Sequence, residues 1–334
     1  MYQTTLPLEH AVGHILRHNL ADVNGRKALA KGHRIAAADL PRLHALGLSH
    51  LRVAVLEPGD VHEDEAARRL AEAVCGPGIV ARPPAASRVN LLARADGVVR
   101  VDVLALLRIN DVDGLTVATL PNHTLARARK RVATIKIIPF AVPEADLARA
   151  EAIGRAALSG SGGVVALTPL RRLDVGVILV GGAAARERIE RGVYPAIEAR
   201  ITELGSTVLA SRYVESEEAA IAAVITELRL TGAQMLIIAG ETSIMDRDDV
   251  TPQALRLASG RVEHYGAPVE PGNLLLLGYL DELPVLGAPG CVRSRDVNIV
   301  DLLPRGCWPA SALQGAISSS LGMGGCSAST QRPK

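Results

Sequence analysis

Four acidic residues and an arginine gather in the segment GETSIMDRDDVTPQAL, which runs from Gly240 to Leu255. It follows the apolar run 235–239, whose length and β-branched content are typical of a buried parallel strand. Thr251 and Pro252 then predict the cap and the first residue of a helix. The charged side chains therefore lie where a strand passes into a helix, and ligands of open α/β sheets bind at such points.

Three aspartates of this segment, Asp246, Asp248 and Asp249, lie too close in sequence to be dispersed surface charge. An aspartate at a helix entrance is often only a cap, but a cap needs one residue and Thr251 already offers it. We therefore expect a functional role for at least one of the three. Carboxylates beside a phosphate site commonly hold Mg²⁺, and Asp249 is the first candidate ligand, with Asp246 second.

Glycines stand at three strand ends that the sequence places at one edge of the same sheet. They let a ligand approach the backbone, and two neighbouring hydroxyls add hydrogen-bond donors, so these segments can hold a phosphate or another oxyanion. Neither GxGxxG nor GxxxxGK[ST] is present, which argues against an ordinary dinucleotide site or P-loop. The candidate binding residues are Gly181, Gly182, Gly240, Thr242, Ser243, Pro289 and Gly290.

The elements that position these residues alternate regularly from residue 174 onward. Apolar runs that predict strands are followed by segments that predict helices, and this order implies a doubly wound, mainly parallel sheet. The expected strands are 175–182, 206–214 and 234–240, and the expected helices are 184–205, 216–232 and 251–259.

Ahead of this region the sequence predicts a smaller α/β or α+β part. Apolar residues at helical spacing predict an amphipathic helix from Leu6 to Leu20, and the acidic residues after His62 favour a second helix over 62–76. A proline-rich join at 77–89 leads into a small mixed α/β unit with a connecting helix. The expected domains are 1–76, 77–173, 174–310 and a poorly ordered tail, 311–334.

Composition narrows the classes of partner and the compartment. The 48% apolar fraction includes only 2% aromatic residues, so Ala, Val, Leu and Ile must build a core of the kind found between strands and helices. A formal net charge of +2 gives no overall field for nucleic acid or anionic lipid, and no apolar stretch is long enough to span a bilayer. The four cysteines show neither a CxxC pair nor zinc-finger spacing, which favours the reducing cytoplasm.

The segment from 174 to about 304 resembles the molybdopterin-binding domain shared by molybdopterin adenylyltransferases and molybdopterin molybdotransferases. The pieces that carry the resemblance are VGVILVGG, GETSIMDRDDVTP, VEPGNLLLLG and PVLGAPGCVRS. It implies that Asp249 is the family's functional aspartate and that Glu215 is a second acidic position after the second strand. It further implies that Pro289 and Gly290 form the family's proline-glycine turn.

The earlier part of the chain also resembles molybdotransferases, in LEHAVGHILRHNL and KGHRIAAADLPRLHALGLSHLRV. The pieces VNLLARADGVVRVD, LLRIND and RVATIKIIPFAVP resemble a less studied group of molybdopterin-binding proteins. Three family features differ in this chain. The SxxDG[YF]A segment is absent, GGAAA ends the first strand where an acidic or hydroxyl residue is usual, and AGETS replaces the glycine-rich GG[TV][GS].

The resemblance implies an enzyme of molybdenum cofactor biosynthesis that binds molybdopterin and uses Mg²⁺ and, for adenylyl transfer, ATP. Its reaction would be adenylyl transfer or molybdate insertion, and the protein would be a homo-oligomer, as is usual in the family. The alternative is a non-catalytic carrier or sensor for molybdopterin, which the missing acidic group after the first strand favours. Fold analogy alone leaves a third hypothesis, a binder of an unrelated nucleotide.

Overall fold

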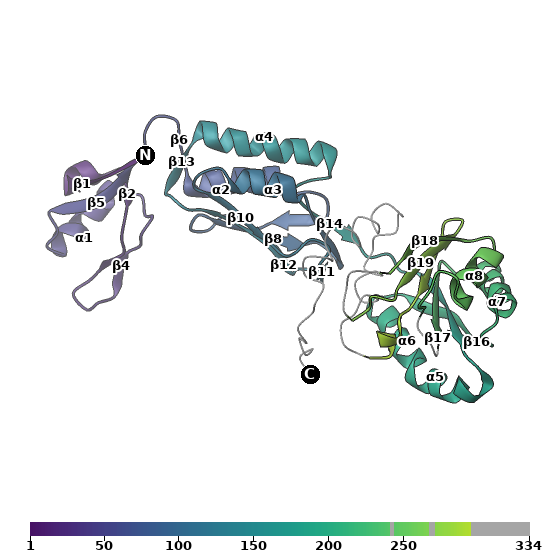
Figure 1. Cartoon of the computed structure of the whole chain (residues 1–334). Coiled ribbons are helices and arrows are strands. Elements are labelled where there is room, and N and C mark those ends of the chain that lie inside the picture. Colours follow the sequence, from purple (N-terminus) through teal and green to yellow (C-terminus); the bar gives the residue numbers. More distant parts are fainter. Residues whose placement is uncertain (241–243, 267–270, 295–334) are drawn as a thin grey trace. The chain divides into compact units, whose positions relative to one another are not determined.

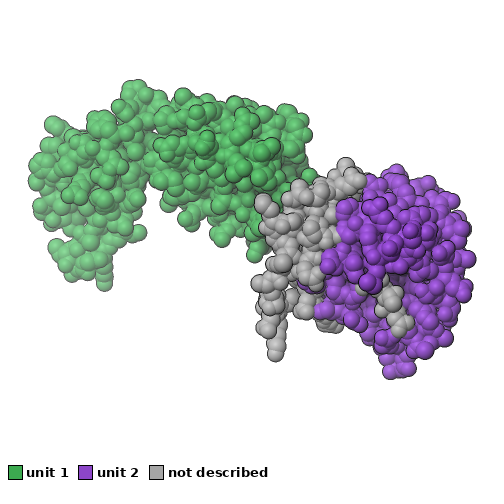
Figure 2. Space-filling view, in the orientation of Figure 1, with its two compact units in different colours: residues 1–168 green, residues 169–334 purple. Residues whose placement is uncertain are grey.

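The computed structural model describes residues 1–240, 244–266 and 271–294 of the chain. The chain divides into two compact units, unit 1 (Met1–Thr168) and unit 2 (Pro169–Lys334), which Figure 2 shows in two colours. Both units combine helices and strands, so the chain has the α/β fold class that its sequence predicts. Thr242, Ser243 and the predicted tail 311–334 lie outside the described residues.

Six strands of the described part of unit 2 form one sheet, in the order β16-β15-β17-β20-β19-β18. The first four of these strands run parallel to one another, whereas β19 and β18 are antiparallel to their neighbours. The strands are β15 (Asp174–Val180), β16 (Thr207–Val214), β17 (Met235–Gly240), β18 (Arg261–Tyr265), β19 (Leu276–Leu280) and β20 (Leu283–Gly287).

Helices pack on both faces of this sheet (Figure 1). They are α5 (Arg186–Gly192), α6 (Tyr194–Glu203), α7 (Glu218–Leu230) and α8 (Val250–Leu257). Val177 and Leu179 of β15 belong to one apolar core with residues of α5 and α6, whereas Ile178 and Val180 belong to another with residues of α7 and α8. Because successive strand residues point to opposite faces, the two pairs of helices cover opposite faces.

The single helix expected over 184–205 is two helices in the structure. Val193 interrupts it, with φ −103° and ψ −48°, and α6 begins at Tyr194. Pro195 lies in the first turn of α6, where its missing N–H costs nothing, and a proline there disfavours a continuous helix through the residues before it. The other helices and strands expected in this region form, with their ends shifted by a few residues.

The central part of unit 1 is a four-stranded antiparallel sheet in the order β10-β12-β8-β7, beside which α2, α3 and α4 lie in Figure 1. This central part also contains a three-stranded sheet, β11-β9-β14, and the strand pair β13-β6. The bounds are as follows: β6 Asp60–His62, α2 Glu63–Val74, β7 Ile79–Ala81, β8 Arg88–Ala93, β9 Gly97–Val101, α3 Val103–Asn110, β10 Leu115–Thr119, β11 Leu125–Ala126, β12 Arg131–Ile137, β13 Ala141–Pro143, α4 Glu144–Gly160 and β14 Val165–Pro169.

The first part of unit 1 contains a three-stranded antiparallel sheet, β1-β5-β2, with its own apolar core. The predicted helix from Leu6 to Leu20 is wrong, because this stretch holds only a 3₁₀ turn at Leu8–Ala11 and strand residues. Gly13, with φ +85°, ends any helix there. The bounds are β1 Tyr2–Pro7, β2 Ile15–Leu16, β3 Leu20–Ala21, β4 Lys27–Leu29, α1 Leu40–Ala45 and β5 His50–Val55.

No helix within the described residues is both long enough and apolar enough to cross a bilayer.

Candidate functional site

A cavity of about 90 Å³ lies at the carboxyl ends of β15 and β17 in unit 2; we call it the strand-end pocket. Three of the sequence-predicted glycines, Gly181, Gly182 and Gly240, line it together with the first residues of α8. The structure therefore brings these three candidates into one place. The complete lining of the described part is Val180, Gly181, Gly182, Ser216, Ile238, Gly240, Ile244, Val250, Thr251 and Ala288.

The two glycines after β15 differ in what surrounds them. A Cβ on Gly181 would lie 2.7 Å from both the Ile189 side chain and the Tyr213 hydroxyl, so a larger residue would have to displace the ends of these side chains. A Cβ on Gly182 would meet no atom within 4 Å. The Tyr213 hydroxyl donates a 2.8 Å hydrogen bond to the Gly182 carbonyl, which fixes the course of this loop. Gly181 is thus closely packed, while Gly182 leaves the backbone open to a ligand.

Asp249 is the residue directly before α8 and so occupies the cap position. The sequence predicted Thr251 for that position. Its Oδ2 accepts hydrogen bonds from the backbone N–H groups of Met245 (2.5 Å) and Asp246 (2.9 Å), so it closes the loop that enters the helix. Asp246 in turn accepts a 2.8 Å hydrogen bond from the N–H of Asp248. Neither Asp249 nor Asp246 belongs to the lining of the strand-end pocket, although Val250 and Thr251 follow Asp249 directly.

The loop carries a negative field that bears on any anion bound nearby. Burial raises the pKa of Tyr265, and the charges of Asp249 and Asp246 raise it further. The Tyr265 hydroxyl donates to the Ile244 carbonyl at 3.2 Å, beside the pocket. The charge of Arg247 opposes this effect. A cation such as Mg²⁺ would favour the binding of a phosphate next to these aspartates.

The fit of these residues to Mg²⁺ is partial. In the part of the chain that the structure describes, no three acidic, histidine or cysteine side chains gather closely enough to hold a metal ion. Protein-bound Mg²⁺ commonly takes only one or two carboxylates and completes its shell with water and substrate phosphates. Asp249 and Asp246 could therefore serve as such ligands only together with a bound phosphate.

Two hydroxyl residues line the pocket that the sequence did not single out as binding residues. Thr251 is 7% exposed and lies in the first turn of α8, and Ser216 follows the end of β16. Both can donate a hydrogen bond to a phosphate oxygen at a helix N-terminus or strand end. The sequence did contain a signal for Ser216. It is the second residue after β16, whose carboxyl end lies at the same edge of the sheet as those of β15 and β17.

The remaining candidates lie next to the pocket rather than in its lining. Glu215 is exposed, and its neighbour Ser216 lines the pocket. Pro289 is buried and precedes the 3₁₀ turn Gly290–Arg293, while Ala288 lines the pocket. Glu215 follows β16 and Pro289 follows β20, and the carboxyl ends of these strands lie at the same edge of the sheet as the pocket.

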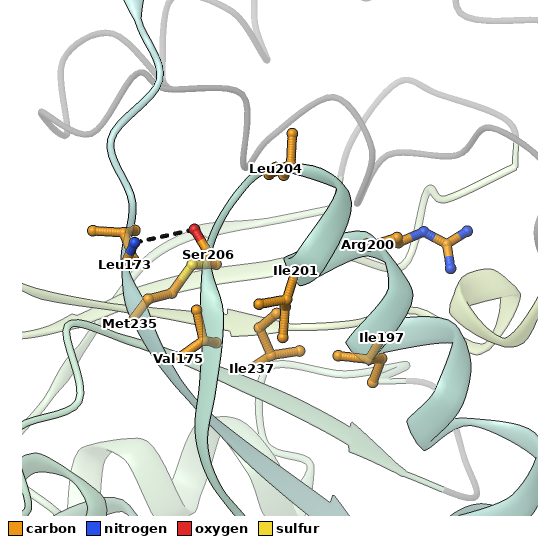
Figure 3. A pocket seen from close by; sticks show the side chains of 9 residues that line it. All are labelled: Leu173, Val175, Ile197, Arg200, Ile201, Leu204, Ser206, Met235 and Ile237. Carbon is orange, nitrogen blue, oxygen red and sulfur yellow. Dashed lines mark hydrogen bonds between the residues drawn. The ribbon is translucent and has the colours of Figure 1, made fainter. Parts of the chain in front are cut away.

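A second cavity of unit 2 lies at the opposite, amino ends of β15 and β17 (Figure 3). It is lined mainly by apolar side chains such as Val175, Ile201 and Ile237, and its volume is about 20 Å³. In Figure 3 the guanidinium of Arg200 points away from these side chains. It donates instead to the backbone carbonyls of Ala196 and Val292. A space of this size holds about one water molecule, so this cavity is a packing defect.

Comparisons with known proteins give low similarity. A family model described as a domain of unknown function (DUF8806) matches residues 5–55. No curated protein matches the sequence.

Three solved structures match this chain at low identity and low TM-score. Molybdenum cofactor biosynthesis protein B is 12% identical with a TM-score of 0.29, over 44% of this chain and 94% of that chain. The molybdopterin biosynthesis MoeA protein from Pyrococcus horikosii is 14% identical with a TM-score of 0.26, over 86% of this chain and 70% of that chain. The protein CinA with unknown function from Thermoplasma acidophilum is 18% identical with a TM-score of 0.27, over 43% of this chain and 97% of that chain. At these values the function has to be argued from the site.

Proposed function

We propose that unit 2 binds molybdopterin at the strand-end pocket and that the chain acts in molybdenum cofactor biosynthesis. The observation that carries the proposal is the meeting of Gly181, Gly182 and Gly240 with the first turn of α8 in one cavity. Backbone N–H groups at a helix N-terminus favour a bound phosphate, and molybdopterin carries a terminal phosphate. The sequence resemblance of 174–304 supplies the rest of the ligand's identity.

In this proposal the phosphate lies against the open backbone at Gly182 and accepts a hydrogen bond from Thr251. Among the described residues the Thr251 hydroxyl has no hydrogen-bond partner, although the residue is only 7% exposed. Because it lines the pocket, this hydroxyl is available to donate to a ligand. The pterin would extend from the pocket across the strand ends.

The catalytic form of the proposal gives Asp249 and Asp246 the task of holding Mg²⁺ against the bound phosphate. The ion would neutralise charge on the reacting phosphates, and alignment would supply most of the remaining rate. In adenylyl transfer a phosphate oxygen of molybdopterin attacks the α-phosphorus of ATP and pyrophosphate leaves. In molybdate insertion the adenylylated form takes up molybdate and releases AMP. Glu215 is a second acidic residue for either reaction.

A non-catalytic carrier or sensor of molybdopterin is the second candidate, and a specific observation favours it. Asp249 Oδ2 is already engaged by the N–H groups of Met245 and Asp246, which is the arrangement of a structural loop closure. Ala183 follows Gly182, so the strand end supplies no carboxylate there. These two features favour binding without turnover.

The finer features of the proposal are that the sheet of unit 2 is doubly wound and that the protein is a cytoplasmic homo-oligomer. The four parallel strands with helices on both faces support the first. The sequence resemblance supports the second.

The test of the proposed function is incubation of the full chain with molybdopterin, Mg²⁺ and ATP, followed by mass analysis of the pterin. Adenylylated molybdopterin would establish the transferase. A second incubation supplies adenylylated molybdopterin and molybdate in place of molybdopterin and ATP. A stoichiometric complex whose pterin stays unchanged in both incubations would establish the carrier. Absence of any complex under both conditions would refute the proposal.

A further inference from the structure

A cavity of about 390 Å³ in unit 1 is lined by cationic side chains from three separate segments. Arg17 follows β2, Lys31 follows β4, and Lys136 lies on β12. His18 adds a fourth basic side chain to the lining. Because the three cations come from distant parts of the sequence, the fold itself brings them to one place.

None of the residues that the structure describes forms an ion pair with Arg17, Lys31 or Lys136, whereas arginines such as Arg68 and Arg69 are paired with carboxylates. The α-amino group of Met1 also lines the cavity, but Glu57 and Asp60 pair with it at 2.6 and 2.7 Å. Like charges that outnumber the counter-charges beside them repel one another. A bound anion would remove this repulsion.

Two of the cations are held in place. The Nζ of Lys31 lies 5.3 Å from the centre of the Phe140 ring, a cation–π contact. The Nζ of Lys136 donates to the Ala86 carbonyl at 3.1 Å and also contacts the hydroxyl of Ser87. Charges fixed in this way lose little conformational entropy when an anion binds.

The turn that Lys136 contacts is strained. Ala86 and Ser87 have φ values of +49° and +63°, and Ala85 and Arg88 on either side exchange two backbone hydrogen bonds. A two-residue hairpin turn of this kind usually contains Asn-Gly, because a positive φ costs most other residues conformational free energy. Strained turns of non-glycine residues concentrate at functional sites. Ser87 of this turn is 1% exposed and lines the cavity.

Among the described residues, Glu63 is the only carboxylate in the lining, and it is 9% exposed. Burial raises the pKa of its carboxyl group, against the opposing effect of the Lys136 charge. Arg17, Lys31 and Lys136 outnumber this single carboxylate, so the cavity stays cationic.

Part of the lining is apolar. Phe140 is buried, and Ile138 is 62% exposed although it lines the cavity. An exposed isoleucine beside fixed cations suits a ligand with an apolar body and a charged group. Three cations favour a dianionic phosphate over a carboxylate, since each can donate to a different phosphate oxygen.

We propose that this cavity is a second binding site, for a small organic phosphate. Its phosphate contacts Arg17, Lys31 and Lys136, and its apolar or ring-shaped body packs on Ile138 and Phe140. Its described lining belongs to unit 1 and shares no residue with that of the strand-end pocket.

The test is calorimetric titration of the full chain with phenyl phosphate, with phenol and inorganic phosphate as the two partial probes. Phenyl phosphate is expected to bind at one site, more tightly than inorganic phosphate, and phenol is expected not to bind. Lys31→Ala and Arg17→Ala should each weaken binding by at least about tenfold, since each removes a charge-assisted hydrogen bond. Their matched controls are Lys27→Ala and Arg26→Ala, at exposed positions outside the cavity lining.

Retained binding in the two controls, with loss in Lys31→Ala and Arg17→Ala, supports the site. Equal weakening in all four variants would mean general charge attraction and would overturn it. Binding that Lys31→Ala and Arg17→Ala leave intact but Gly182→Leu removes would place phenyl phosphate at the strand-end pocket. That outcome would also overturn the inference, while leaving the proposed function of unit 2 standing.

Discussion

Asp249 joins two tasks that can be separated by substitution. Its Oδ2 accepts two backbone hydrogen bonds in the loop before α8, and an asparagine can accept both through its side-chain oxygen. If the residue also holds Mg²⁺, Asp249→Asn should lower the rate of adenylylation by orders of magnitude while changing the free energy of unfolding by no more than about 1 kcal/mol. Steady-state assays and urea unfolding measure the two effects.

The matched control for this substitution is Asp248→Asn, one residue away and with its side chain 80% exposed. It should change neither rate nor stability. Normal turnover in folded Asp249→Asn would show that the residue only closes the loop and would remove the metal role.

The sequence predicted part of the candidate site and missed the rest for a local reason. Glycines after apolar runs are a signal that needs no tertiary information, and Gly181, Gly182 and Gly240 do line one pocket. Thr251 was interpreted as a helix cap, but α8 begins at Val250, so Thr251 falls in the first turn and lines the pocket. A shift of one or two residues at a helix start changes which side chain reaches a ligand, and sequence patterns do not fix helix starts that closely.

At the scale of elements, the packing of α2 against α4 depends on a glycine. A Cβ on Gly154 of α4 would lie 2.5 Å from the backbone carbonyl oxygen of Ala73 in α2, which cannot move without shifting the helix. Gly154→Ala should therefore lower the free energy of unfolding of unit 1, because overpacking of about 1–3 kcal/mol exceeds the gain of about 1 kcal/mol in helix propensity. Thermal and urea unfolding followed by circular dichroism would measure it.

Gly160→Ala, at the end of the same helix, is the control, because its Cβ would meet no atom within 4 Å. It should leave stability unchanged or raise it. If Gly154→Ala proved as stable as Gly160→Ala, α2 and α4 would not pack as closely as described.

Ion pairs also connect α2 and α4, and their carboxylates become protonated in acid. Arg69 of α2 pairs with Glu151 and Glu144 of α4, each at 2.7 Å, and these hydrogen bonds lower the pKa of both carboxyl groups from the ordinary value of 4.5. Their contribution to stability is present above that value and is lost as the pH falls through the lowered pKa. Arg69→Met should therefore destabilise unit 1 at neutral pH, and the difference from the unmodified protein should shrink in acid.

Arg68→Met is the control for this pH dependence, because Arg68 pairs only within α2, with Glu65 and Glu72, at the surface. It should have a smaller effect at neutral pH. Urea unfolding at several pH values compares the two variants, and a pH-independent difference for Arg69→Met would argue against the ion pairs as its cause.

Secondary structure was predicted well where strands and helices alternate and poorly at the start of the chain. The alternation after residue 174 is a local pattern repeated several times, and β15, β16 and β17 form where it predicts. The stretch from Leu6 to Leu20 has buried residues at helical spacing, but Ile15 and Leu16 pair with β5, some forty residues away in sequence. Pairing between distant strands overrides a helical pattern, and only Gly13 signalled the break.

At the scale of the whole molecule, the proposed homo-oligomer is open to a direct measurement. The family resemblance predicts that the chain associates into a closed, symmetric assembly, most simply a dimer. Sedimentation equilibrium at micromolar concentration should give a multiple of the 35.1 kDa chain mass. A single species at the chain mass over this range would refute the prediction without affecting the binding proposals.

The central claim is that molybdopterin binds at the strand-end pocket, and a glycine substitution tests it most directly. Gly182 lines the pocket and Gly192 does not, yet both are exposed and a Cβ at either would meet no atom within 4 Å. The measurement is the dissociation constant of molybdopterin for the unmodified protein, Gly182→Leu and Gly192→Leu. We expect Gly182→Leu to weaken binding by at least about tenfold, since its side chain takes the ligand's place, and Gly192→Leu to bind normally. Equal affinity in all three proteins would contradict the claim.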